Sequence, residues 1–235
     1  MTYHSPVLLK ESIEGLNLKP DGVYVDVTFG GGGHSKEILK FLKNGMLYSF
    51  DQDHDALSNK MSSDNFKMIR ANFRFLKNFL KLEGVDRVDG VLADLGVSSY
   101  QFDTAERGFS LRFDAELDMR MNIDSSLNAK EIINTYSEEK LADMFFKYGD
   151  ITQSRKLANK IINARFEKHI STTNELIFVV ESLSPIKKRN QFLARVFQAI
   201  RIEVNDEINA LKEMLNSATK LLNPGGRIVV ISYHS

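Results

Sequence analysis

The sequence predicts an open, parallel α/β sheet that is interrupted by an all-helical insertion. Three observations lead to this fold class. Apolar, β-prone runs alternate with amphipathic helical patterns through the first part of the chain, as in βαβ units. Between Asp103 and Pro185, mostly helical periodicity continues without a convincing strand. A long helical pattern and one more strand pattern follow, so we expect the sheet to resume after the insertion.

Four strands are expected before the insertion, because four runs are nearly continuous in apolar, β-branched and aromatic residues. These runs span residues 23–29, 46–50, 67–71 and 88–95. Helical patterns lie between them at residues 35–43 and 73–82. Since helices separate consecutive strands, we expect the strands to be parallel.

Within the insertion, residues 137–148 and 153–167 have the spacing of two amphipathic helices. The entrance to the insertion, residues 104–121, is rich in charge and is expected to be a long ordered loop. A helical pattern then runs from residue 186 to 223, before a fifth strand at residues 227–233. The expected domains are a discontinuous sheet domain of residues 1–103 and 190–235, and a helical insertion of residues 104–189.

The composition excludes several classes of protein. The 235 residues include 31 lysines and arginines and 31 aspartates and glutamates, so the formal net charge is zero. The net charge therefore gives no indication of a nucleic-acid partner. The absence of cysteine excludes disulfides and thiolate zinc sites, and the five histidines lack the spacing of metal ligands. Neither a signal peptide nor a long apolar run is present, so we expect a cytoplasmic protein with no metal and no membrane contact.

Four consecutive glycines, residues 30–33, follow the first strand and open a helix, which is typical of a loop that binds a nucleotide-like cofactor. The dinucleotide fingerprint G-x-G-x-x-G is met only in part, because its third position holds Ser35. Asp51 ends the second strand, where an acid hydrogen-bonds the ribose of a dinucleotide or of an adenosyl cofactor. A tight turn without a ligand is the alternative for the loop. The histidines expected near this site are His4, His34 and His234.

Asp94 ends the fourth strand and is followed by Ser98, Ser99 and Tyr100. An acid here suits an enzyme that acts on an exocyclic amine, because an acceptor must hold the NH₂ group, localise its lone pair and accommodate the departing proton. Asp94 is therefore the candidate catalytic residue, with Ser98 and Ser99 as further contacts, and a cap on the next segment is its alternative role. Phe73, after the third strand, suits either an adenine contact or a position in the core.

Two basic segments are candidates for contacts with RNA. The first, residues 107–121, mixes arginines with aromatic residues. This mixture suits base stacking and phosphate contact in single-stranded RNA, and the alternative is a loop tied down by Arg–Asp pairs. The second, residues 187–201, is basic and has no acid between Pro185 and Glu203. Such a run suits either contact with the phosphates of RNA or a solvated helix face. The candidate residues are Arg107, Arg112, Arg120, Lys187, Lys188, Arg189, Arg195 and Arg201.

Several segments together resemble one known family. The most specific are Ala93-Asp-Leu-Gly-Val-Ser-Ser99 and Leu117-Asp-Met-Arg-Met121. The other matching segments, in order along nearly the whole chain, are His4-Ser-Pro-Val-Leu-Leu9, 24–35, Asp51-Gln-Asp53, Glu106-Arg-Gly-Phe-Ser110, Tyr148-Gly149, 195–205, Pro224-Gly-Gly-Arg227 and Val230-Ile-Ser-Tyr-His-Ser235. On these residues the chain resembles the bacterial small-subunit ribosomal RNA methyltransferase H family.

This resemblance implies a class I, Rossmann-like methyltransferase fold. It implies that S-adenosylmethionine is the cofactor and that the substrate is the exocyclic N4 of a cytidine in the decoding region of 16S rRNA, within the small ribosomal subunit. It also implies that the helical insertion recognises RNA and that the family's last strands are missing after Ser235. The implied cofactor contacts are Gly32, Gly33 and His34 at the methionine end, Asp51 at the ribose, and Phe73, Asp94 and Gln101.

The residues taken alone leave other functions open. A nicotinamide oxidoreductase shares the glycine loop and Asp51, but it does not explain the segment that follows Asp94. A non-catalytic RNA-binding or ribosome assembly factor that retains a cofactor pocket is a second alternative. An amine methyltransferase that acts on another nucleic acid is a third. The oligomeric state is also open, with a homodimer as one option.

Overall fold

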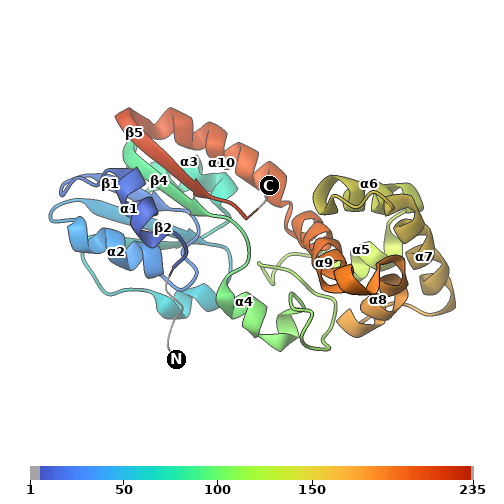
Figure 1. Ribbon diagram of the computed structural model, residues 1–235. Helices are drawn as coiled ribbons and strands as arrows, with labels where there is room; N and C mark the ends of the chain where they lie inside the picture. Colours follow the sequence, from blue (N-terminus) through green and yellow to red (C-terminus); the bar gives the residue numbers. More distant parts are fainter. Residues whose placement is uncertain (1–5, 234–235) are drawn as a thin grey trace. The chain divides into compact units, whose positions relative to one another are not determined.

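The computed structural model describes residues 6–233, and the chain divides into two compact units (Figure 1). We call residues up to Tyr100 and from Ile208 onward the sheet unit, and residues Gln101–Glu207 the helical unit. The helical unit is longer at both ends than the expected insertion, residues 104–189. The chain returns to the sheet unit at Ile208 instead of residue 190, because helix α9 (Arg189–Asn205) packs against α6 (Glu138–Gly149) and belongs to the helical unit.

Five parallel strands form the sheet, in the order β3-β2-β1-β4-β5. This arrangement confirms the predicted parallel α/β class, with β1 between β2 and β4. The strands are β1 (Val23–Asp26), β2 (Met46–Asp51), β3 (Phe66–Arg70), β4 (Val88–Asp94) and β5 (Leu222–Ile231).

Helices cover both faces of the sheet, because successive strand residues point to opposite faces. Tyr24 packs with α1 (Leu9–Leu16) and α2 (Gly33–Phe41), whereas its neighbour Val25 packs with α3 (Leu76–Leu82) and α10 (Glu207–Leu221) (Figure 1). Two apolar cores result, one on each side of the sheet. The sheet unit also contains two short 3₁₀ segments, η1 (Asp55–Asn59) and η2 (Phe73–Phe75).

The helical unit is built from amphipathic helices around a core of its own. Its helices are α4 (Ser99–Asp103), which begins in the sheet unit, α5 (Ala129–Thr135), α6 (Glu138–Gly149), α7 (Ser154–Glu167), α8 (Thr173–Val180) and α9 (Arg189–Asn205). Its 3₁₀ segments are η3 (Ala105–Arg107), η4 (Glu181–Leu183) and η5 (Ile186–Lys188). Thr172 and Glu175 form a capping box that begins α8, since each side chain accepts from the other residue's backbone N–H.

The prediction of one long helix over residues 186–223 is wrong, because two helices, α9 and α10, lie within this range. Asp206 adopts a left-handed conformation with φ 48°, which ends α9 and separates it from α10. Among the described residues, no helix has the length and apolar character needed to cross a membrane.

Candidate active site

Three carboxylates lie at the carboxyl ends of neighbouring strands. Asp26 ends β1, Asp51 ends β2 and Asp94 ends β4. Because β1 lies between β2 and β4, all three residues reach the same edge of the sheet. In open parallel sheets this edge is where ligands bind.

The glycines in the loop after β1 differ in their surroundings: Gly32 and Gly33 are closely packed, whereas Gly30 faces open space. Gly32 caps α2 with φ 75°, and a Cβ atom there would lie 2.8 Å from Cζ of Phe29. A Cβ atom on Gly33 would lie 2.3 Å from Cγ of Pro6, so packing alone excludes larger residues at both positions. Gly30 has φ 50°, but a Cβ atom on it would meet only Cβ of Ser98 at 3.6 Å. Gly30 therefore leaves open space beside the loop.

That space is a hollow of about 230 Å³, partly open to solvent, within the sheet unit. Its lining includes Gly30, Asp51, Asp53, Asn59 and Ser98. The carboxylates of Asp51 and Asp53 are among its lining groups, which suits a ligand that presents hydroxyl groups.

Asp51 is the best-defined acceptor in this hollow. Its Oδ2 accepts from the Gly30 backbone N–H at 2.8 Å, and its Oδ1 accepts from the Asp53 N–H at 2.9 Å. Burial raises the pKa of Asp51 to about 6, and the charges of Asp53 and Asp26 add to this rise. The two backbone hydrogen bonds act in the opposite direction. Each carboxylate oxygen keeps a further lone pair, so Asp51 can still accept hydroxyl donors.

Asp26 is a site residue that the sequence analysis does not single out. It is 1% exposed, and its Oδ2 accepts from the Ser35 hydroxyl at 2.6 Å, while Ser35 Oγ lies 2.8 Å from Ser49 Oγ. Asp26 Oδ1 also accepts from the Thr28 N–H. Burial raises the pKa of Asp26, and these hydrogen bonds limit the rise. An acid inside the apolar run Tyr24-Val-Asp-Val27 was the available signal.

Asp94 presents an unused acceptor. Its Oδ1 is buried and makes no hydrogen bond within the described chain, although its backbone N–H donates to Thr28 Oγ1 at 2.7 Å. Burial raises the pKa of Asp94, and the charge of Asp26 adds to the rise, whereas His34 and a hydrogen bond from Tyr233 lower it. A buried acceptor without a donor is unfavourable, so this oxygen is suited to a donor supplied by a ligand.

The other predicted site residues occupy different environments. His34 is buried in α2, with Nε2 3.1 Å from the Val7 carbonyl oxygen. Phe73 is half-buried against the core on the α3 face, so the structure is compatible with both of its expected roles. Ser99 is exposed at the start of α4, whereas Ser98 lines the hollow. Gln101 is buried, and it belongs to the helical unit. Two of the predicted residues, His4 and His234, lie outside the described residues.

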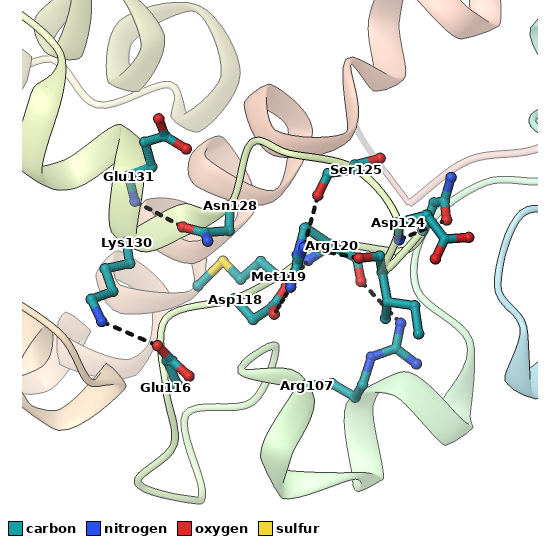
Figure 2. A network of polar contacts seen from close by, with 12 residues as sticks. Arg107, Glu116, Asp118, Met119, Arg120, Asp124, Ser125, Asn128, Lys130 and Glu131 are labelled. Atoms are coloured by element: carbon teal, nitrogen blue, oxygen red, sulfur yellow. Dashed lines mark hydrogen bonds and ion pairs between the residues drawn. The ribbon is translucent and has the colours of Figure 1, made fainter.

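Three of the candidate arginines hold the helical unit together. Arg107 donates to the carbonyls of Arg120 and Met121 at 2.9 and 3.2 Å. Arg120 pairs with Asp118 at 2.7 Å and also donates to backbone carbonyls, as Figure 2 shows. Arg201 makes two hydrogen bonds to Glu207. Arg120 therefore matches the alternative of a loop tied down by Arg–Asp pairs, and Arg107 holds the same loop through backbone carbonyls.

The remaining candidates are more exposed. Arg189 pairs with Glu181 at 2.7 Å, and Arg195 lies 3.6 Å from the Asp150 carboxylate. Lys187 and Lys188 are exposed in η5. Arg112 is exposed in the loop before α5 and pairs with Asp103.

Asn205 fixes the loop that carries Arg120. Its Oδ1 accepts from the Met121 N–H at 2.7 Å, and its Nδ2 donates to the carbonyls of Met119 and Arg201, both at 2.8 Å. Met119 is fully buried with φ 57°, a conformation that is unfavourable for a side chain of this size. The Asn205 side chain thus supports a strained turn.

Comparisons with a family model and with curated proteins both match this chain to methyltransferases. A family model described as "MraW methylase family" matches residues 1–235. Curated proteins named "Ribosomal RNA small subunit methyltransferase H" are similar to this chain along its length. The one from Flavobacterium johnsoniae is 56% identical over 236 residues, which cover 100% of this chain and 78% of the relative. The one from Phocaeicola vulgatus is 56% identical over 234 residues, or 99% of this chain and 77% of the relative.

Proposed function

Since this chain belongs to the MraW methylase family, as its motifs predicted, we propose that it methylates small-subunit ribosomal RNA with S-adenosylmethionine as the methyl donor. We further propose that the acceptor atom is the exocyclic N4 of a cytidine in the decoding region of 16S rRNA. The observation that carries this proposal is the buried, unpartnered Oδ1 of Asp94 at the end of β4.

The residues of the sheet unit fit an adenosyl cofactor. Asp51 offers lone pairs to ribose hydroxyls from within the hollow, and Gly30 leaves space for a close approach to its backbone. Gly32 is the N-cap of α2, and its N–H donates to the Phe29 carbonyl; Gly33 and His34 begin the helix, whose first-turn N–H groups favour the carboxylate of the methionine moiety. When bound, S-adenosylmethionine supplies a methyl group that its sulfonium already activates.

Asp94 is proposed to act on the acceptor amine. The lone pair of a cytosine amine is delocalised into the ring, so it is a poor nucleophile until an acceptor holds its N–H groups. Asp94 Oδ1 is available for such an N–H, and the raised pKa of this carboxyl favours its taking the proton that leaves the amine. Ser98 and Ser99 follow on the same segment and are proposed as further contacts of the base.

The protein contributes mainly by positioning. Holding two reactants in a productive geometry can lower a barrier by roughly 7–11 kcal/mol. The Asp94 backbone is fixed by its hydrogen bond to Thr28, and Thr28 is in turn held by Asp26, so the ends of β1 and β4 are linked. The target cytosine must be unpaired or flipped out for its amine to reach Asp94.

The test is methylation of a defined substrate. Unmodified small ribosomal subunits are incubated with the protein and labelled S-adenosylmethionine, and the digested RNA is analysed by mass spectrometry. We expect N4-methylcytidine with the wild-type protein. We expect none with Asp94→Asn and retained activity with Asp64→Asn, which alters an exposed carboxylate of the same unit. Label in another nucleoside would contradict the proposed acceptor atom.

A further inference from the structure

We propose that Phe102, Arg112 and Phe113 form a stacking platform for an unpaired base of the RNA substrate. This inference rests on the proposed function and names the part of the helical unit that would hold RNA. We refer to these three residues as the Arg112 platform. All three lie within the helical unit, two of them in the loop that follows α4.

The Arg112 guanidinium lies against both rings. Its Cζ atom is 5.0 Å from the ring centroid of Phe102 and 5.4 Å from that of Phe113. Both distances are within the range of cation–π contacts. One planar cation and two aromatic faces are therefore gathered at one place, from residues up to eleven positions apart in the sequence.

The platform is held in place by hydrogen bonds. Arg112 Nη2 donates to Asp103 Oδ1 at 2.5 Å, and its Nε donates to the buried Ser110 hydroxyl at 3.3 Å. The carbonyl of Phe113 accepts from the buried Thr173 hydroxyl at 2.9 Å. Preorganisation of this kind lowers the entropy lost on binding.

The platform is also accessible. Phe102 is 40% exposed, Phe113 is 38% exposed, and the Arg112 side chain is 55% exposed. Another arginine–aromatic pair in the same loop serves as a comparison. Arg107 lies 5.9 Å from the Phe109 ring, but Phe109 is only 6% exposed and Arg107 donates to backbone carbonyls. The Arg107 pair is thus internal, whereas the Arg112 platform faces solvent.

The charge of the platform favours a base over a phosphate. Asp103 balances the charge of Arg112, so the group has little net attraction for a phosphate. What it offers is π faces and a planar guanidinium, which are the groups that stack on bases in single-stranded RNA. A stable protein interface buries about 800 Å² on each partner, which three side chains do not supply, so a single base is the better occupant.

The experiment measures binding of a short, fluorescein-labelled single-stranded RNA by anisotropy over a range of salt concentrations. Phe102→Leu and Phe113→Leu keep apolar volume but remove the ring. Loss of one stacked base predicts binding weaker by roughly 5- to 150-fold. The slope of log affinity against log salt should not change, because neither ring neutralises a phosphate. Phe166→Leu is the matched control, since Phe166 is 88% exposed in α7 of the same unit.

A second series separates stacking from charge. Replacing both Lys187 and Lys188 by Gln should flatten the salt slope, by about 0.7 for each phosphate that is no longer neutralised. Wild-type affinity in both leucine variants, or equal weakening in Phe166→Leu, would overturn the platform. Weakening with a changed salt slope would also overturn it, in favour of phosphate binding through Arg112. Retained cofactor affinity and thermal unfolding check that the variants are folded. The proposed function fails separately, if wild-type protein binds RNA but transfers no methyl group to it.

Discussion

Cofactor affinity should depend on pH through Asp51. This carboxyl has a pKa of about 6 in the folded protein, because it is buried and because Asp53 and Asp26 carry like charges. Its charged form, which accepts ribose hydroxyls best, therefore dominates above pH 6 and is lost below it. With a pKa near 6, about nine-tenths of Asp51 is ionised at pH 7 and about one-tenth at pH 5. If only the ionised form binds well, affinity falls roughly tenfold over this range.

Calorimetric titration of the protein with S-adenosylmethionine, at several pH values between 5 and 8, measures this effect. Asp51→Asn cannot ionise, so its affinity should be low and nearly independent of pH. The control Asp64→Asn, at an exposed carboxylate of the same unit, should keep the wild-type profile. Titration of the cofactor itself affects all three proteins equally. A wild-type profile that is flat from pH 5 to 7, or a slope in Asp51→Asn as steep as that of the wild type, would refute the reasoning.

Four further outcomes follow from the structure. Gly32→Ala places a methyl group against Phe29 at a positive φ, so urea unfolding should show a loss of roughly 1–3 kcal/mol, whereas Gly30→Ala, also at a positive φ but beside open space, should cost less stability than Gly32→Ala and should weaken cofactor binding. Asp94→Asn should abolish methyl transfer in the nucleoside assay, and calorimetry should show weaker but measurable S-adenosylmethionine binding, because Asp94 is also an implied cofactor contact; unchanged turnover would exclude the acceptor role. Asn205→Ala leaves buried backbone groups unpaired and should cost roughly 2–4 kcal/mol by urea unfolding; a loss below about 1 kcal/mol would contradict this view.

The strands were predictable because their signal is local. Runs of β-branched and aromatic residues gave all five strands, with ends displaced by a few residues. β1 stops at Asp26, before the predicted limit of residue 29, although Val27 and Phe29 still donate to backbone carbonyls of the neighbouring strands. The break at Asp206 was not predictable from periodicity, since α9 and α10 are both amphipathic and neither glycine nor proline lies between them. Helix α1 was also not predicted from the sequence.

The candidate site residues were predictable where an acid stands directly at the end of an apolar strand pattern. Asp51 and Asp94 are recognisable by their positions at strand ends. The arginines were harder to interpret, because their partners are decided by tertiary contacts. Arg201 meets Glu207 across the turn at Asp206, and the Arg120 loop is fixed by a side chain 84 to 86 residues away. A basic residue that supports the fold and one that contacts a ligand look alike in sequence.

The three strand-end carboxylates together explain why a cationic ligand suits this edge of the sheet. Asp26 is fully buried, and its charge raises the pKa of both Asp51 and Asp94. Each ionised carboxylate therefore makes ionisation of the others less favourable, and His34 offsets part of this repulsion. In the proposed function, the methyl donor carries a positive sulfonium and the spent product does not. We therefore expect the ionised carboxylates to attract the sulfonium of the donor but not the neutral sulfur of the product, which would favour product release after each transfer.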